Sequence, residues 1–135
     1  MTTNYRDAFI QVATDCPIYR AQVPPLDLTK PSVAALQYEL LAAQPYHFTS
    51  DELLFAVHAR RAGIPDDQLE QERERFFAKP QACLRSSPLS KRYGWGTHHD
   101  EHGRVALVGL GNPDYDRFAA DISLTQKQAL RSAKS

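Results

Sequence analysis

The fold depends most on the stretch from Tyr93 to Leu110, YGWGTHHDEHGRVALVGL. Its two ends, Tyr93–His99 and Arg104–Leu110, are rich in the aromatic and β-branched residues that favour strands. Asp100–Gly103 lies between them, and Gly103 can adopt the positive φ that a tight hairpin loop requires. We therefore predict two antiparallel strands joined by a short loop.

A further strand is predicted near the N-terminus, over Ala8–Ala13. Apolar residues alternate there, with Ile10 and Val12 on one face and Phe9 on the other. This period of two, with apolar groups on both sides, is typical of a strand in the interior of a sheet. The next segment, 16–30, is interrupted by prolines, which fix φ and lack an amide donor, so it is predicted to be an extended connector.

Three helices are predicted between this connector and the hairpin. The first is expected from Thr29 to about Ala43, where apolar residues recur at helical spacing. The second begins at a capping box formed by Thr49 and Glu52 and ends at Gly63, which can adopt the left-handed conformation. The third is expected over 66–78, with its apolar residues buried and its Glu and Arg residues paired at i, i+3.

A fourth helix is predicted from Pro113 to about Ile122. Three strands and three or four helices predict an α+β fold, with a small antiparallel sheet made of the N-terminal strand and the C-terminal hairpin. We expect a single domain over residues 1–122, followed by a polar tail over 123–135 that is either helical or disordered. The order of helices and hairpin also fits a winged-helix-like module.

The overall composition narrows the classes of protein. The chain has 135 residues, with 16 basic and 16 acidic side chains, so it lacks the basic excess typical of nucleic-acid-binding domains. The N-terminus lacks a basic, apolar signal pattern, and no apolar run approaches the roughly 20 residues that span a bilayer. We therefore expect a cytoplasmic protein without a membrane partner, in which Cys16 and Cys83 remain thiols.

The neutral total hides a local asymmetry. Residues 51–77 carry a net charge of −3, and residues 79–104 carry +3. Guanidinium, ammonium and hydroxyl donors beside flat aromatic faces suit a small anion such as a carboxylate or phosphate. We predict a binding domain with an anion-accepting pocket in the segment from Cys83 to Trp95. The candidate ligand-binding residues are Arg85, Ser87, Lys91, Arg92, Tyr93 and Trp95.

Two alternative functions remain open from the sequence. A winged-helix-like module could bind nucleic acid or protein, although Asp66 and Asp67 at the start of its third helix would repel DNA. An enzyme could use Cys83 or His98, but no partner base is evident and the catalytic residues stay unknown. The opposite charges of the two segments also suit association between copies of the chain.

No cofactor is identified by any motif. The histidines at 98, 99 and 102, with Asp100 and Glu101, contain ligand types that bind zinc or nickel. Neighbouring residues on a strand point to opposite faces, so His98 and His99 would not join one site. We therefore expect no metal site.

The segment Lys79–Gly96, KPQACLRSSPLSKRYGWG, resembles the hallmark of a family of small bacterial proteins classed as a domain of unknown function. Thr3–Tyr5, Val33–Glu39 and Asp51–Phe55 share the resemblance. It covers most of the chain from Thr3 to about Tyr115. The resemblance implies relatives and no particular activity, cofactor or partner.

Overall fold

A four-stranded mixed sheet, in the order β3-β2-β1-β4, forms the centre of the fold. The structure is a computed structural model, and it describes residues 2–132. Strand β1 (Ala8–Gln11) lies inside the sheet and pairs antiparallel with β2 (Trp95–His99). Strand β3 (Val105–Gly109) pairs antiparallel with β2 through the predicted hairpin, and Gly103 in its loop has a φ of 80°. The α+β fold and the three predicted strands are therefore confirmed.

The fourth strand, β4 (Thr125–Gln128), lies in the region for which the sequence predicted helix or disorder. It pairs parallel with β1, so the sheet is mixed rather than purely antiparallel. The Thr125 amide donates to the Asp7 carbonyl at 2.8 Å, and the Ala129 amide donates to the Gln11 carbonyl at 2.9 Å. Its polar sequence suits an edge position, because most of its side chains are exposed. The end of the predicted tail, 133–135, lies outside the described residues.

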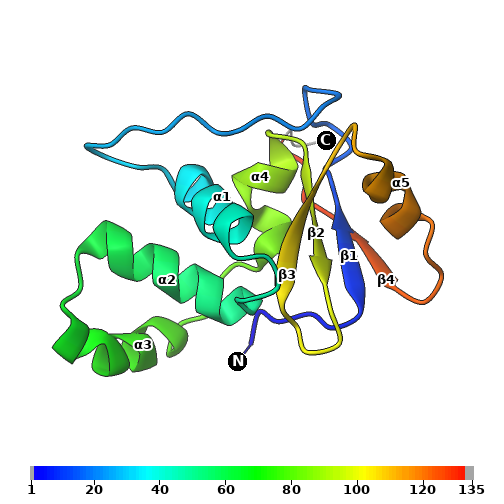
Figure 1. Cartoon of the computed structure of the whole chain (residues 1–135). Helices are drawn as coiled ribbons and strands as arrows, with labels where there is room; N and C mark the ends of the chain where they lie inside the picture. The colour runs from blue at the N-terminus through cyan, green and yellow to red at the C-terminus, as the bar shows by residue number, and fades with distance from the viewer. Residues whose placement is uncertain (1, 133–135) are drawn as a thin grey trace.

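Helices cover both faces of this sheet (Figure 1). Helices α1 and α2 lie on one side and α5 lies on the other, while the short α4 precedes β2. Two short 3-10 turns, at Asp66–Gln68 and Leu84–Ser86, precede α3 and α4. The bounds are α1 Val33–Ala43, α2 Ser50–Ala62, α3 Leu69–Phe77, α4 Pro88–Lys91 and α5 Pro113–Ala119.

The starts of α1 and α2 are set by capping side chains. At α2 the predicted capping box is present, with Thr49 and Glu52 bonded reciprocally, and Gly63 ends the helix at a φ of 64°. Helix α1 begins four residues later than Thr29, because the Asp27 carboxylate accepts from the amides of Thr29 and Lys30 and holds them in a turn. Ser32 is its N-cap.

Two apolar clusters separate the helices from the sheet. Ile10 belongs to the larger cluster, with Leu36 of α1 and Leu53 of α2. Phe9 belongs to the smaller one, on the α5 side. Val12 was predicted on the Ile10 face but packs with Phe9, because β1 ends at Gln11 and the Val12 amide instead donates to the Tyr115 hydroxyl at 2.8 Å.

Helix α3 differs from its predicted form. None of its residues is buried, because it packs against α2 and not against the sheet. Arg75 lies 3.7 Å from Glu72, but Arg73 lies over the Phe77 ring at 4.9 Å instead of pairing with Glu70. Within residues 2–132, no helix has both the length and the apolar composition needed to cross a membrane.

Candidate anion-binding cleft

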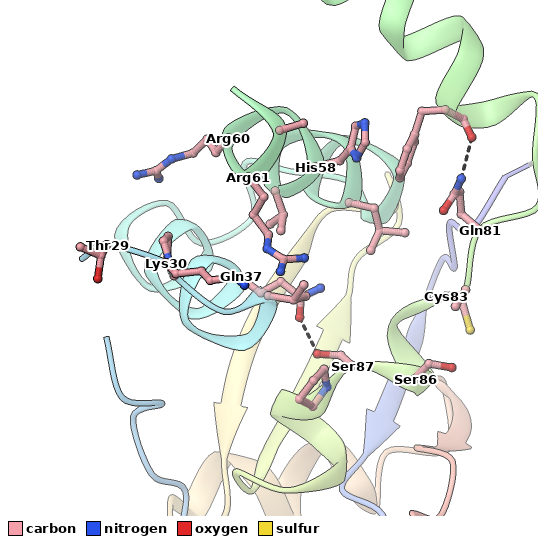
Figure 2. A pocket seen from close by; sticks show the side chains of 18 residues that line it. Thr29, Lys30, Gln37, His58, Arg60, Arg61, Gln81, Cys83, Ser86 and Ser87 are labelled. Atoms are coloured by element: carbon pink, nitrogen blue, oxygen red, sulfur yellow. Dashed lines mark hydrogen bonds between the residues drawn. The ribbon is translucent and has the colours of Figure 1, made fainter. Parts of the chain in front are cut away.

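A cleft of about 730 Å³ lies between the start of α1, the last turns of α2 and the segment 81–88. Phe76 of α3 contributes part of its wall. Figure 2 shows the side chains that line the cleft. The walls come from four separate parts of the chain: 29–37, 54–62, 76 and 81–88. The cleft therefore exists only because the helices pack together, and no single motif could specify it.

The charged side chains that line the cleft are all cationic or histidine. Lys30, Arg60 and Arg61 contribute to the lining, which contains no aspartate or glutamate among the described residues. Arg60 lies 3.9 Å from Glu39 and extends away from the cleft, whereas Arg61 points into it, toward Gln37 (Figure 2). Within residues 2–132, no carboxylate pairs with Arg61. The cleft is therefore electropositive, with Arg61 as its inward cation.

Gln37 provides a neutral polar group beside Arg61. Its side chain is only 2% exposed, although it lines the cleft. The Ser87 hydroxyl donates to Gln37 Oε1 at 2.5 Å, and Ser87 Oγ accepts from the Leu89 amide at 3.2 Å as the N-cap of α4. In the described part of the chain, Gln37 Nε2 has no hydrogen-bond partner. Ser87 therefore fixes the amide so that a nearly buried donor is left for a bound molecule.

Apolar side chains complete the lining of the cleft. They include Val33 of α1, Leu54 and Val57 of α2, and Phe76. His58 stacks on the Phe76 ring, with 4.7 Å between centroids, and its Nε2 lies 3.2 Å from Glu72 Oε1. These contacts hold α3 against α2, and the apolar side chains form much of the remaining lining of the cleft.

The structure places the predicted cationic residues outside this cleft. Arg85 Nε donates to the Gln128 carbonyl at 2.7 Å, so its guanidinium secures the edge strand β4. Lys91 is the last residue of α4, and Arg92 follows it with an exposed side chain. Of the six predicted ligand-binding residues, Ser87 alone lines the cleft.

Tyr93 and Trp95 hold the connector against the sheet. The Tyr93 carbonyl accepts from the Gln22 amide at 2.9 Å, and Trp95 Nε1 donates to the Gln22 carbonyl at 2.8 Å. At Gly94, with a φ of 78°, an added Cβ would lie 3.1 Å from the Ala21 backbone. Gly94 therefore has a packing role, because the absence of a side chain lets the connector approach the sheet closely.

The two residues of the enzyme alternative lie on opposite faces of the sheet. Cys83 Sγ accepts from the Tyr5 hydroxyl at 3.2 Å. Burial, followed by this contact with Cys83, raises the pKa of Tyr5 to about 12, so the phenol remains protonated and is no base for the thiol. His98 Nδ1 lies 2.8 Å from the Tyr46 hydroxyl and its ring stacks on Phe118 of α5.

His98 and His99 face opposite sides, as strand alternation predicts. His99 is fully buried on the α1 and α2 side, where Nε2 lies 3.0 Å from Thr97 Oγ1 and Nδ1 has no partner among residues 2–132. Burial, with a smaller effect of His98, lowers the pKa of His99 to about 4. Burial also lowers the pKa of His98. Both rings are therefore neutral at pH 7.

Lys30, Gln37 and Arg61 were missed by reasoning from the sequence. No motif in the sequence singled out Arg61, and Gln37 lay within the shared stretch Val33–Glu39 without a predicted role. A polar residue within an apolar helical stripe is the signal that was available at Gln37, because it follows Leu36 in the face that α1 buries.

The fold and this cleft define an α+β domain with an electropositive, partly apolar cleft. The chain belongs to the Family of unknown function (DUF6157), whose model matches residues 1–135. The predicted membership of a family of unknown function is thereby confirmed, while its bacterial origin stays a prediction. Neither a curated protein nor a solved structure matches the chain.

Proposed function

We propose that this protein is a binding domain that takes a small organic anion into the cleft between α1, α2 and the segment 81–88. The observation that carries the proposal is the set of side chains at the cleft: Lys30 and Arg61 line it, and among residues 2–132 no aspartate or glutamate does. A cation that points into a partly enclosed site without a carboxylate partner favours an anionic ligand.

The proposal keeps the class of ligand predicted from the sequence and changes the residues that hold it. The segment that begins at Cys83 still forms one wall, through Cys83, Ser86 and Ser87. The cations, however, come from the end of α2 and the approach to α1. The sequence alone predicted a different set of anion-binding cations, Arg85, Lys91 and Arg92. The two sets can be tested separately by substitution.

Thermal shift and isothermal titration calorimetry with a panel of small organic carboxylates and phosphate esters test the proposal. Binding to the native state raises the melting temperature by mass action. We expect Arg61→Ala to remove most of the response, and Arg92→Ala, which alters an exposed arginine outside the cleft, to leave it unchanged. A response abolished by Arg92→Ala and retained in Arg61→Ala would instead support the sequence-predicted site. No response to any anion would refute both.

The other predicted functions remain predictions. A nucleic-acid or protein interaction module, a reaction at Cys83 or His98, and self-association through opposite charges have no contact among residues 2–132 that favours them over the cleft. An electrophoretic mobility shift at low salt tests the nucleic-acid version, and sedimentation at two ionic strengths tests self-association.

A further inference from the structure

The arrangement of the hydrogen-bond donors in the cleft favours a particular shape of anion as well as a negative charge. Gln37 Nε2 is a donor without a partner among residues 2–132, on a residue that is 2% exposed, and it faces the cleft beside Arg61 (Figure 2). An amide and a guanidinium are both planar groups. Two planar donors side by side match the two in-plane oxygens of a carboxylate.

The acceptor side of Gln37 is already occupied. Its Oε1 accepts the Ser87 hydroxyl proton, so in this structure the amide nitrogen is the group that faces the cleft. A ligand therefore meets a donor at this point. A carboxylate only accepts hydrogen bonds and carries the negative charge that strengthens them, whereas a hydroxyl is a neutral and weaker acceptor.

The apolar part of the lining favours a ligand with an apolar body. Leu54, Val57 and Phe76 present apolar surface into a cleft of about 730 Å³, which is within the range of small-molecule sites. A bare inorganic anion would leave this wall in contact with water. An acyl chain or an aromatic ring would cover it and remove its apolar surface from water, which favours binding.

From these contacts we infer that the ligand is a carboxylate attached to an apolar acyl or aryl body, and that Gln37 is the residue that determines specificity for the carboxylate. This inference rests on the proposed function, since it assumes that the cleft binds an anion. The Ser87 hydroxyl is a positioning group, because it acts on the ligand through Gln37.

Calorimetry with four probes separates the two claims. Octanoate supplies both parts of the ligand, acetate lacks the apolar body, 1-octanol lacks the charge, and octyl phosphate replaces the carboxylate. We expect octanoate to bind more tightly than the other three. Octyl phosphate binding as tightly as octanoate would overturn the carboxylate assignment and leave anion binding standing, whereas 1-octanol binding as tightly as octanoate would overturn anion binding itself. If acetate bound as tightly as octanoate, the inference that the ligand has an apolar body would be overturned.

The Gln37→Glu variant is the sharpest test of the specificity residue. A carboxylate at this position would retain an oxygen for the Ser87 hydroxyl, but it replaces the free donor with a negative charge. Circular dichroism of the variant checks that it is folded. We expect octanoate affinity to fall roughly 10- to 100-fold, the effect of losing a hydrogen bond to a charged group. Affinity for 1-octanol should not fall. Gln71→Glu, which makes the same change at an exposed position of α3 outside the cleft, is the matched control and should bind octanoate normally. Unchanged octanoate binding by Gln37→Glu would overturn the role of Gln37.

Discussion

The bond between Ser87 and Gln37 links the stability of the fold to the geometry of the cleft. Both residues are buried, with exposed fractions of 5% and 2%. In Ser87→Ala, Gln37 Oε1 loses its donor, and the N-cap bond to the Leu89 amide is also lost. A buried acceptor left without a partner costs about 1–3 kcal/mol, so we expect the free energy of unfolding to fall by about 2 kcal/mol.

Equilibrium unfolding in urea, followed by circular dichroism and by the fluorescence of Trp95, the single tryptophan, measures this change. With a typical slope of about 2 kcal/mol/M, the midpoint should shift by about 1 M. Ser86→Ala is the matched control, because its side chain makes no hydrogen bond to any other residue within 2–132. We expect its stability to stay within about 0.5 kcal/mol of the original chain.

A double-mutant cycle isolates the pair itself. Gln37→Leu removes the amide whose oxygen Ser87→Ala would leave unpaired, so the combined variant should be more stable than the sum of the single effects by about 1 kcal/mol. Two results would refute the reasoning: Ser87→Ala as stable as Ser86→Ala, or additive effects in the cycle. Either would mean that Ser87 does not hold the Gln37 amide.

Further predictions concern the sheet, a helix start and a buried histidine. At Gly96 an added Cβ would lie 2.8 Å from the Phe9 ring, so Gly96→Ala should lower the free energy of unfolding by about 1–3 kcal/mol, measured in urea. Thr49→Ala removes the capping box and should cost about 1 kcal/mol by the same measurement, with Thr125→Ala on the exposed edge strand as control. Burial lowers the pKa of His99 from 6.5 to about 4, so the unfolded chain takes up the proton first, and urea midpoints should show stability falling by up to about 3 kcal/mol as the pH drops from about 6.5 to 4. In His99→Gln this part of the pH dependence should disappear; if it persisted, His99 would not be its source.

Elements with local signals were predicted well, because their boundaries depend on neighbouring residues. The capping box at Thr49, the left-handed glycine at Gly63 and the hairpin loop at Gly103 each act within a few residues. The start of α1 was placed too early because Asp27 captures the following amides, a side-chain contact that competes with the helix.

Strand β4 could not be predicted in this way. Thr125–Gln128 has no apolar alternation, since one edge and much of its surface are exposed. It is a strand because β1, more than a hundred residues earlier, offers a free edge for parallel pairing. Arg85 strengthens that pairing from a third part of the chain by donating to the Gln128 carbonyl. This is tertiary information, which composition and periodicity do not contain.

The cleft was partly within reach of sequence reasoning, because α1 and α2 are joined by a short connection. Helices joined in this way run side by side in opposite directions, which places the residues before the first helix beside the last turn of the second. That rule brings Lys30 near Arg61, and both line the cleft.

The net charge of −3 over residues 51–77 concealed this site, because it averages over all faces of α2 and α3. Glu70 and Glu74 are exposed on α3 outside the cleft, whereas Arg61 points into it. The sign of the charge at the cleft is therefore set by the helix faces that line it and not by the sum along a segment. This is why an acidic stretch of sequence provides the inward cation of the proposed anion-binding cleft.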